Sequence, residues 1–287
     1  MPNERSVVVT GASTGIGLGT ARVLATHGVH VFASVRREGD AERLRGELGN
    51  RVTPLRFDVT DERAIADAVP VVREALGGRT LFGLVNNAGI AFGGPLLYQP
   101  VDEVRRVLEV NLLGTLRVTQ AFAPLLGVDR LLAGPPGRIV NVSSIAGRIA
   151  GPFLGAYSAS KHGLEALSES LRRELTLHGI DVIIVGPGAV ATPIWDKAER
   201  TDGTSYADTE YGPALARFRN AFVAGGRRGY PPEYVGEVIW RALTARHPRW
   251  RYAVVQRSLV NWTLLRALPH RALDRMIARG LGFRGPR

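Results

Sequence analysis

Tyr157 and Lys161 are the residues of this sequence best suited to acid–base chemistry. They stand four positions apart in a segment with a helical pattern, so both side chains lie on one face of the expected helix. A phenol with its ordinary pKa of about 10 exchanges protons poorly at neutral pH, but a neighbouring ammonium favours the phenolate and would lower that pKa. Ser144, thirteen residues before the tyrosine, ends a buried strand pattern, and Ser143 beside it is the alternative hydroxyl. The three side chains therefore predict proton exchange with a carbonyl or an alcohol.

A glycine-rich turn precedes the first expected helix. Gly11, Gly15 and Gly17 follow a strand pattern with the spacing Gly-x-x-x-Gly-x-Gly. Such glycines allow a tight turn and a close approach of the backbone to a pyrophosphate, and the N–H groups of the helix N-terminus then bind the phosphates. The turn predicts a dinucleotide site, and the other residues expected to bind the cofactor there are Ser13, Thr14 and Ile16.

The end of the second strand indicates which dinucleotide is bound. A carboxylate there would accept a hydrogen bond from the adenosine ribose, but this sequence has Val35 followed by Arg36 and Arg37, and the first acid is Glu38. A guanidinium binds a 2′-phosphate in a fork, so NADP(H) is favoured over NAD(H). Arg37 is either a second phosphate ligand or a solvated loop residue.

The rest of the chain alternates short apolar runs with amphipathic segments. The strands are continuous hydrophobic runs, as expected when helices cover both faces of a sheet, and the alternation predicts an α/β fold with a doubly wound, seven-stranded parallel sheet. The expected strands are 6–10, 30–35, 52–57, 81–86, 137–143, 181–185 and 252–255. The expected helices are 15–26, 41–48, 61–76, 101–126, 155–178 and 232–246.

Composition excludes several classes of function. The 287-residue chain has no cysteine, so disulfides, thiolate catalysis and cysteine-bound metals are excluded, and we expect no metal site. The net charge of +11 comes almost entirely from dispersed arginines, with two lysines in all. A nucleic-acid-binding protein would cluster this charge among aromatic residues, so no nucleic-acid partner is expected. No signal peptide or membrane-spanning run is visible, which predicts a cytoplasmic protein.

Several of these motifs occur in a familiar order. The glycine turn, Asn86-Asn-Ala-Gly89, Asn111, Ser144, the tyrosine–lysine pair and Pro187-Gly188 follow one another along the chain. Over residues 5–257 the chain resembles the short-chain dehydrogenase/reductase family, and most of all its hydroxysteroid and retinol dehydrogenase-like branch. The resemblance implies a single-domain Rossmann fold with a C-terminal helical extension. It also implies a homodimer or homotetramer packed through the helices at 101–126 and 155–178.

The resemblance also assigns catalytic roles to Asn111, Ser144, Tyr157 and Lys161. Tyr157 would move the proton while hydride passes between the nicotinamide and a secondary alcohol or ketone. Lys161 would also hold the nicotinamide ribose, and Asn111 would kink its helix and hold a water molecule that links Lys161 to solvent. A dinucleotide-binding sensor without turnover, or an isomerase or dehydratase, is the rival hypothesis. The complete set of four residues argues against the sensor, and its arrangement fits simple hydride transfer better than an isomerase or dehydratase.

Further cofactor contacts are implied along the same edge of the sheet. Asp58 would accept from the adenine amino group, although a turn role for it, or a helix cap at Thr60, competes. Asn86 and Asn87 either pass near the adenosine ribose or tie neighbouring strands together. Gly186 stands where many relatives carry a larger residue, which predicts a wider pocket. The remaining expected cofactor contacts are Val59, Asn87, Ala88, Gly89, Pro187, Gly188, Val190 and Thr192.

The substrate pocket is predicted to be apolar. Segments next to the expected site are rich in aliphatic and aromatic residues, which favours a small lipophilic alcohol or ketone such as a steroid, a retinoid or a long-chain compound. Phe153 and Leu154 have an alternative place at a subunit interface. The candidate lining residues are Phe92, Ser144, Ile149, Phe153, Leu154 and Trp195.

Two segments depart from the strand–helix alternation: one lies within the Rossmann domain expected at 1–257, and the other follows it. Residues 189–228 form an insertion that is too long for a simple connection, which predicts a substrate-binding loop or lid. Residues 258–287 are a basic amphipathic extension. This extension either rests on an anionic membrane as a peripheral contact or docks over the active site or against a partner subunit, and the docked arrangement is favoured.

Overall fold

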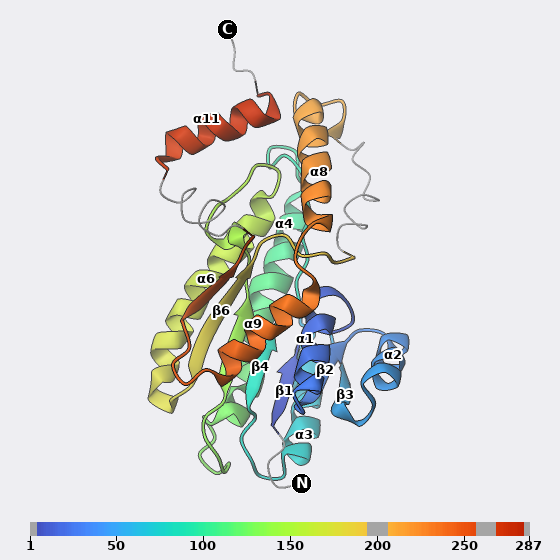
Figure 1. The fold of residues 1–287 in the computed structure, drawn as a ribbon, viewed down its shortest axis with the longest axis vertical. Helices are drawn as coiled ribbons and strands as arrows, with labels where there is room; N and C mark the ends of the chain where they lie inside the picture. Colours follow the sequence, from blue (N-terminus) through green and yellow to red (C-terminus); the bar gives the residue numbers. More distant parts are fainter. Residues whose placement is uncertain (1–4, 194–205, 257–267, 284–287) are drawn as a thin grey trace.

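The structure, a computed structural model, is a three-layer α/β fold (Figure 1) and describes residues 5–193, 206–256 and 268–283. Within the described residues, the middle layer is a parallel sheet of seven strands in the order β3-β2-β1-β4-β5-β6-β7. The predicted doubly wound sheet is confirmed. The strands are β1 (Ser6–Val9), β2 (His30–Val35), β3 (Val52–Arg56), β4 (Gly83–Asn86), β5 (Arg138–Val142), β6 (Asp181–Pro187) and β7 (Arg251–Val254).

Helices cover both faces of the sheet. One face packs against α1 (Gly15–Thr26), α2 (Glu38–Leu48) and α9 (Pro232–Thr244). The opposite face packs against α3 (Glu62–Leu76), α5 (Gly114–Phe122) and α6 (Gly155–Glu174). Because strand side chains alternate between faces, Val7 and Val9 enter the first core and Val8 enters the second.

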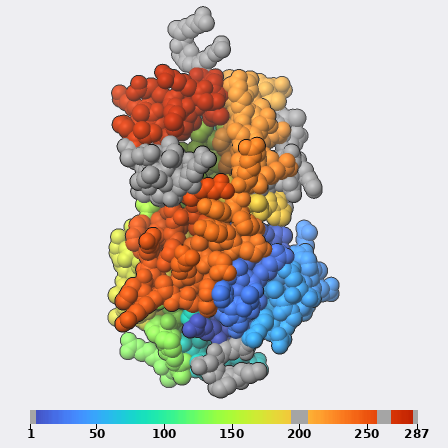
Figure 2. Space-filling model, viewed as in Figure 1, coloured from blue at the N-terminus to red at the C-terminus, as the bar shows by residue number. Residues whose placement is uncertain are grey.

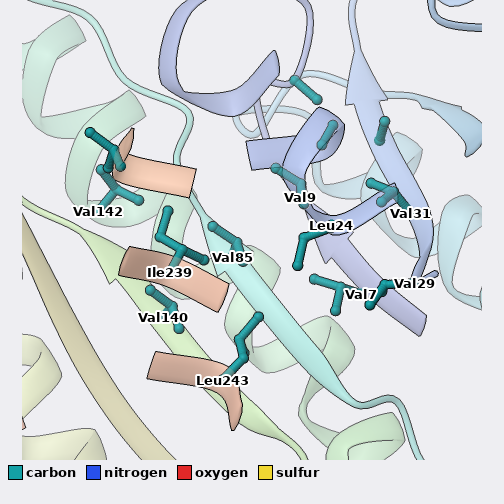
Figure 3. Packing of buried hydrophobic residues seen from close by; sticks show 14 of the residues in the cluster. Val7, Val9, Leu24, Val29, Val31, Val85, Val140, Val142, Ile239 and Leu243 are labelled. Atoms are coloured by element: carbon teal, nitrogen blue, oxygen red, sulfur yellow. The ribbon is translucent and has the colours of Figure 1, made fainter. Parts of the chain in front are cut away.

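The core under α9 is made of small aliphatic side chains. Figure 3 shows Ile239 and Leu243 of α9 over Val85 and Val140, which lie on the two strands after the topological switch between β1 and β4. Gly83 leaves room for Leu243, because a Cβ added at the glycine would lie 2.6 Å from Leu243 Cδ2. This packing fixes α9 against the sheet.

The predicted helix at 101–126 is one continuous helical rod with a local defect. It begins as α4 (Val101–Leu108), passes through a π-helical turn at Glu109–Leu113, continues as α5 and ends in a 3₁₀ turn at Ala123–Leu126. π turns of this kind arise where a helix accommodates an extra residue, often at functional sites. Asn111 occupies the centre of the turn.

Two helices stand at one end of the molecule. α8 (Gly212–Arg227) falls within the predicted insertion, and α11 (His270–Leu281) lies beside it (Figures 1 and 2). Arg217 Nη1 of α8 donates to the Leu281 carbonyl across 2.6 Å. No helix within the described ranges is long and apolar enough to cross a membrane.

We predict that Leu243→Ala lowers the free energy of unfolding by about 2–5 kcal/mol, the range for removing a buried leucine side chain from a packed core. Leu243 is 1% exposed, whereas Leu131 is 93% exposed. Leu131→Ala is therefore the matched control and should change the unfolding free energy by less than about 0.5 kcal/mol. Urea denaturation followed by circular dichroism measures both, and equal effects of the two variants would contradict the packing described here.

Candidate active site

The glycine turn lies at the carboxyl ends of β1 and β4, where the strand order reverses. Gly11 has a φ of 65°, in the left-handed region, and a Cβ there would lie 2.9 Å from Ala88 Cα. A Cβ at Gly17 would lie 2.3 Å from the Gly11 carbonyl oxygen. Only glycine fits both positions. The turn thus brings backbone N–H groups to the crevice where α/β proteins bind dinucleotides.

Helix α1 begins in this turn with its N-terminus open. Thr14 is its N-cap residue, and within the described part of the chain no side chain caps the first turn. The exposed N–H groups near Gly15 and Ile16 form the positive end of a helix dipole, which suits phosphate. Thr192 lies opposite, with its Cγ2 atom 3.3 Å from a Cβ placed at Gly15.

Asn86 and Asn87 both tie strands together. Asn86 Nδ2 donates to Asn141 Oδ1 at 2.9 Å and to Thr119 Oγ1 at 3.0 Å, beneath the site. Asn87 Nδ2 donates to the carbonyl oxygens of Thr10 and Gly11 at 3.0 and 3.2 Å. Of the two roles considered for these asparagines, the structure shows the strand-tying one. A direct cofactor contact of Asn87 stays a prediction, as does one of Ala88 and Gly89.

Arg36 and Arg37 are exposed at the end of β2, next to the glycine turn. Arg36 Nη1 lies 3.6 Å from Asp58 Oδ2, while Asp58 Oδ1 accepts from the Thr60 backbone N–H at 3.0 Å. Asp58 therefore has the turn role considered for it, and its contact with adenine stays a prediction. The helix cap suggested for Thr60 is wrong: Asp61 caps α3 by accepting from Ala64 N.

A third arginine at this edge was missed in the sequence. Arg43 of α2 donates from Nη2 to the Ser13 carbonyl at 2.6 Å and pairs with Asp40 at 2.9 Å. No motif includes Arg43, and only the packing of α2 against the sheet carries its guanidinium to the turn. Val59, the other residue predicted here, is buried after β3, and its side chain packs against Gly114 of α5.

Tyr157, Ser144 and Lys161 come together across the end of β5. The Ser144 hydroxyl faces the Tyr157 phenol and acts to lower the pKa of that phenol. Ser144 Oγ accepts from the Ala146 backbone N–H at 3.1 Å. Ser143 Oγ, by contrast, is buried and has no hydrogen-bond partner among the described residues, and it lies 2.7 Å from a Cβ placed at Gly147. The structure thus sets Ser144 rather than Ser143 against the phenol.

The ammonium of Lys161 is buried beside this pair. Its Nζ donates to the Val142 carbonyl at 2.8 Å and lies 5.8 Å from the centre of the Tyr157 ring, and the residue is 4% exposed. Desolvation lowers the pKa of Lys161 to about 8, although the nearby Glu165 carboxylate opposes the change. At neutral pH the group is still a cation.

The pKa of Tyr157 is raised, chiefly by desolvation, and the nearby Ser144 hydroxyl opposes the rise. Because the residue as a whole is half-buried, the desolvation acts at the hydroxyl end that faces Ser144. The expectation that Lys161 lowers this pKa is wrong. The ammonium is directed at the Val142 carbonyl, and burial of the phenol sets the direction of the shift.

Asn111 is held rigidly in the π turn and is 0% exposed. Its Nδ2 donates to the Ile90 carbonyl and to Ser160 Oγ, both at 2.9 Å, and its Oδ1 accepts from Ile90 N at 2.8 Å. The helix defect expected at Asn111 is present. Asn111 Oδ1 and Lys161 Nζ both approach Gly89, at 3.2 and 3.7 Å from a Cβ placed there. The water relay stays a prediction.

The segment after β6 returns to the cofactor crevice. Pro187 ends the strand, and its carbonyl lies 3.5 Å from Ser144 Oγ. Gly188 N donates to the Val254 carbonyl at 3.0 Å, and Val190 is 3% exposed and bridges to Tyr230. These contacts anchor the loop that carries Thr192 toward the glycine turn, and the cofactor roles of its residues stay predictions.

Phe153 is the centre of an aromatic cluster beside the tyrosine helix. Its ring lies 5.6 Å from Phe218 and 6.3 Å from Tyr211 of the α8 region, and 5.9 Å from Phe283 after α11. Its φ of 64° makes it the one non-glycine residue in the left-handed region among the described residues. Such strain persists where surrounding packing imposes it. Phe153 thus packs inside this chain, which fits the predicted pocket better than the alternative subunit interface.

Other predicted pocket residues lie around this cluster. Ile149, Leu154 and Phe92 are half-buried. Trp195 lies outside the described residues, as does part of the predicted lid. Phe283 joins the end of α11 to the cluster, so the extension is docked on the body of the chain, as favoured. Membrane contact stays a prediction.

The fold and the site define a dinucleotide-binding Rossmann protein with a serine, tyrosine and lysine at the carboxyl edge of its sheet. A family model described as short chain dehydrogenase matches residues 5–203. The chain is 37% identical over 277 residues to an NADPH-dependent 3-dehydrocapnine reductase from Ornithobacterium rhinotracheale, covering 96% of this chain and 97% of that protein. It is 34% identical over 294 residues to human 17-beta-hydroxysteroid dehydrogenase type 6, covering 96% and 88%. It is 36% identical over 290 residues to mouse retinol dehydrogenase 5, with the same coverage.

Solved structures agree with the sequence relatives. A crystal structure of a short-chain dehydrogenase from Streptomyces avermitilis superimposes with a TM-score of 0.76 at 27% identity, covering 99% of this chain and 100% of that one. The fold of a Burkholderia phymatum short chain dehydrogenase/reductase, solved in complex with NAD, matches with a TM-score of 0.78 at 24% identity, covering 96% and 95%. The chain belongs to the short-chain dehydrogenase family of oxidoreductases.

We predict that Lys161 makes stability depend on pH in a defined window. Its pKa is about 8 in the folded protein, below the ordinary lysine value of 10.5, so the unfolded chain binds more protons between these values and stability rises with pH. The gain is on the order of 3 kcal/mol over the full window. Above pH 10 the raised pKa of Tyr157 acts in the opposite direction, so the test uses pH 7 to 10.

Lys161→Met is the comparison, because it removes the titrating group and keeps most of the apolar stem. Urea denaturation at several pH values should show the wild type gaining stability relative to this variant as the pH rises. Parallel curves for the two proteins would contradict the burial of the charged ammonium.

Proposed function

We propose that this protein is an NADP(H)-dependent oxidoreductase that transfers hydride between the nicotinamide and a hydrophobic secondary alcohol or ketone. One observation carries the proposal: the Ser144 hydroxyl faces the Tyr157 phenol at the sheet edge, with the buried Lys161 cation one helical turn away. A hydroxyl donor, a proton-exchanging phenol and a fixed cation are the groups that carbonyl reduction needs.

The residues of the crevice fit a dinucleotide. A pyrophosphate would bind at the uncapped N-terminus of α1. The adjoining turn contains glycines at positions where a Cβ atom would clash with the backbone. Ser13, Thr14, Gly15, Ile16 and Gly17 would hold it, with Thr192 across the crevice. When bound, the nicotinamide supplies or accepts the hydride.

The chain's own residues then handle the proton. In the reducing direction Ser144 donates a hydrogen bond to the substrate oxygen, and Tyr157 donates its phenolic proton to the same oxygen. Burial keeps this phenol protonated at neutral pH, because it raises the pKa. In the oxidising direction Tyr157, as phenolate, takes the proton back from the alcohol. Lys161 would hold the nicotinamide ribose, and Asn111 fixes the neighbouring backbone through Ile90.

The basic edge supports NADP(H) over NAD(H). Arg36 and Arg37 follow β2, Arg43 reaches the neighbouring glycine turn at Ser13, and the position that would carry an acid is Val35. A relative that covers nearly the whole chain is named as NADPH-dependent. A structural neighbour was solved with NAD, so NAD(H) is the alternative that the cofactor experiment below must exclude.

The aromatic cluster supports a lipophilic substrate. Phe153, Tyr211, Phe218 and Phe283 form an apolar cluster next to the start of α6, the helix that carries Tyr157. Relatives at similar identity are named as retinol and hydroxysteroid dehydrogenases. For assembly, the family resemblance is the support for a homodimer or homotetramer packed through the helices at 101–126 and 155–178.

We predict that Tyr157→Phe lowers kcat for ketone reduction by about 10²–10⁴-fold, the usual contribution of a general acid. The ring remains, so NADPH affinity should be unchanged. Tyr234→Phe, at an exposed site on α9, is the matched control and should keep full activity. NADPH oxidation is followed by absorbance against a panel of steroidal, retinoid and long-chain ketones. Full turnover by Tyr157→Phe would refute Tyr157 as the general acid. A wild type that binds NADPH but reduces no ketone in the panel would favour the dinucleotide-binding sensor without turnover.

We also predict that Arg36→Gln and Arg37→Gln each weaken NADPH binding by about 10–100-fold, the effect of losing a hydrogen bond between charged groups. NADH binding should change little, because it has no 2′-phosphate. Arg45→Gln removes the same charge on α2, where Arg45 pairs with Glu38, and should leave both affinities unchanged. Fluorescence titration measures the two dissociation constants. Tighter binding of NADH than NADPH by the wild type would refute the proposed cofactor preference.

A further inference from the structure

The small size of Gly186 in β6 predicted a wider pocket, but the space beside this glycine is occupied. A Cβ placed there would lie 2.4 Å from Arg251 Nη2 and 2.9 Å from Arg251 Cζ. The space that a larger residue would take is filled by a guanidinium from β7. The expectation of a wider pocket is therefore wrong, because Arg251 crosses over the glycine instead.

The guanidinium of Arg251 is buried, and its contacts are specific. Its Nε donates to Glu165 Oε1 and Oε2 at 3.1 and 3.0 Å, and its Nη2 donates to Glu165 Oε1 at 3.0 Å. The same Nη2 lies 3.3 Å from the Ser144 backbone carbonyl. The two side chains are only 6% and 4% exposed. Arg251 thus joins α6 directly to the residue that carries the active-site hydroxyl.

Glu165 lies on the same face of α6 as Tyr157 and Lys161, one turn beyond the lysine. Arg148, just after Ser144 in the chain, donates to Glu165 Oε2 at 2.8 Å from the opposite side. Arg148 also reaches Glu169 at 3.0 Å and is partly exposed. The loop that follows Ser144 is therefore clamped to α6 through one carboxylate.

We propose that Arg251, through its pair with Glu165, is a positioning residue that fixes the Ser144 backbone against α6 and sets the charge beside Lys161. A buried ion pair is a poor source of net stability, because desolvation offsets its attraction. Its value here is geometric: a guanidinium fork has a fixed shape and holds the carboxylate and the carbonyl at the same time. Neither Arg251 nor Glu165 touches the substrate oxygen.

The proposal rests on the proposed oxidoreductase function for its kinetic test. Arg251→Met should lower kcat by at least ~10-fold, since small displacements of a reacting group are costly, while the KM for NADPH stays the same. Arg251→Lys keeps a cation for Glu165 but cannot also hold the Ser144 carbonyl, so kcat should stay low. Gly186→Ala should give the same loss by displacing the guanidinium. Unchanged kcat in these variants would overturn the proposal.

A matched control tests whether any loss merely reflects weakened folding. Arg138 on β5 also pairs with one carboxylate, Asp181 at 3.2 Å, and donates to backbone carbonyls of α9, but at the amino end of the strands. Arg138→Met should lower the unfolding midpoint as Arg251→Met does and leave kcat unchanged. An equal loss of kcat in both variants would show a structural role only and overturn the proposal.

A second readout needs no turnover, because the chain has only two lysines. Selectively ¹³C,¹⁵N-labelled lysine gives two sets of NMR signals, and Lys197→Arg assigns them. The charged or titratable groups that face Lys161 are Tyr157 and Glu165 on α6, with Arg251 of β7 and Arg148 acting through Glu165. The Val142 carbonyl of β5 accepts a hydrogen bond from the Lys161 ammonium.

The titration should shift in opposite directions in two variants. Glu165→Gln removes the anion and should lower the pKa of Lys161 further, whereas Arg251→Met removes a cation and should raise it. Arg251→Lys should leave it near the wild-type value. A loosened structure that admits water would raise the pKa in both Glu165→Gln and Arg251→Met, and that result would overturn the proposal. If the wild type reduces no ketone but the opposite shifts appear, the proposed function fails while the charge-setting part of the inference stands.

Discussion

A positively charged ammonium with almost no contact with water lies at the centre of this protein. Keeping Lys161 charged in that position requires partners, because a buried unpaired charge would lose its proton or open the structure. The Val142 carbonyl at the end of β5 supplies one partner and the Glu165 carboxylate supplies the other. These partners set α6 against β5, and Tyr157 takes its place one turn earlier on the same helix face.

The surroundings of this charge follow from the same constraint. Glu165 is itself buried, so it needs cations of its own, and Arg251 and Arg148 meet it from two sides. Arg251 in turn needs space and a second acceptor, which Gly186 and the Ser144 carbonyl provide. A chain of compensated charges thus runs from the edge strand β7 to the hydroxyl beside the phenol. The structure ties the active-site geometry to a strand that no motif includes.

The sequence predicted correctly those features that depend on residues close together in the chain. The helix at 15–26 and the strand at 30–35 have the predicted bounds, because the glycine turn and the apolar runs depend on neighbours in the chain. The juxtaposition of Tyr157 and Lys161 needed only helical spacing. The direction of the Tyr157 pKa was wrong, because it depends on desolvation by residues distant in sequence and on where the lysine amine points.

The residue types and their order were enough to identify the fold, the nucleotide turn and the candidate acid–base pair, since backbone conformation and periodicity are properties of short segments. Long-range packing assigned the rest. It brought Arg43 to the glycine turn, placed Phe153 among rings from α8 and α11, and filled the space over Gly186 with Arg251. These contacts join residues tens of positions or more apart in the chain, and their geometry comes from how the layers close on one another. No local pattern carries that information, so Tyr157 and Lys161 could be found in the sequence, but the charge network that holds them could not.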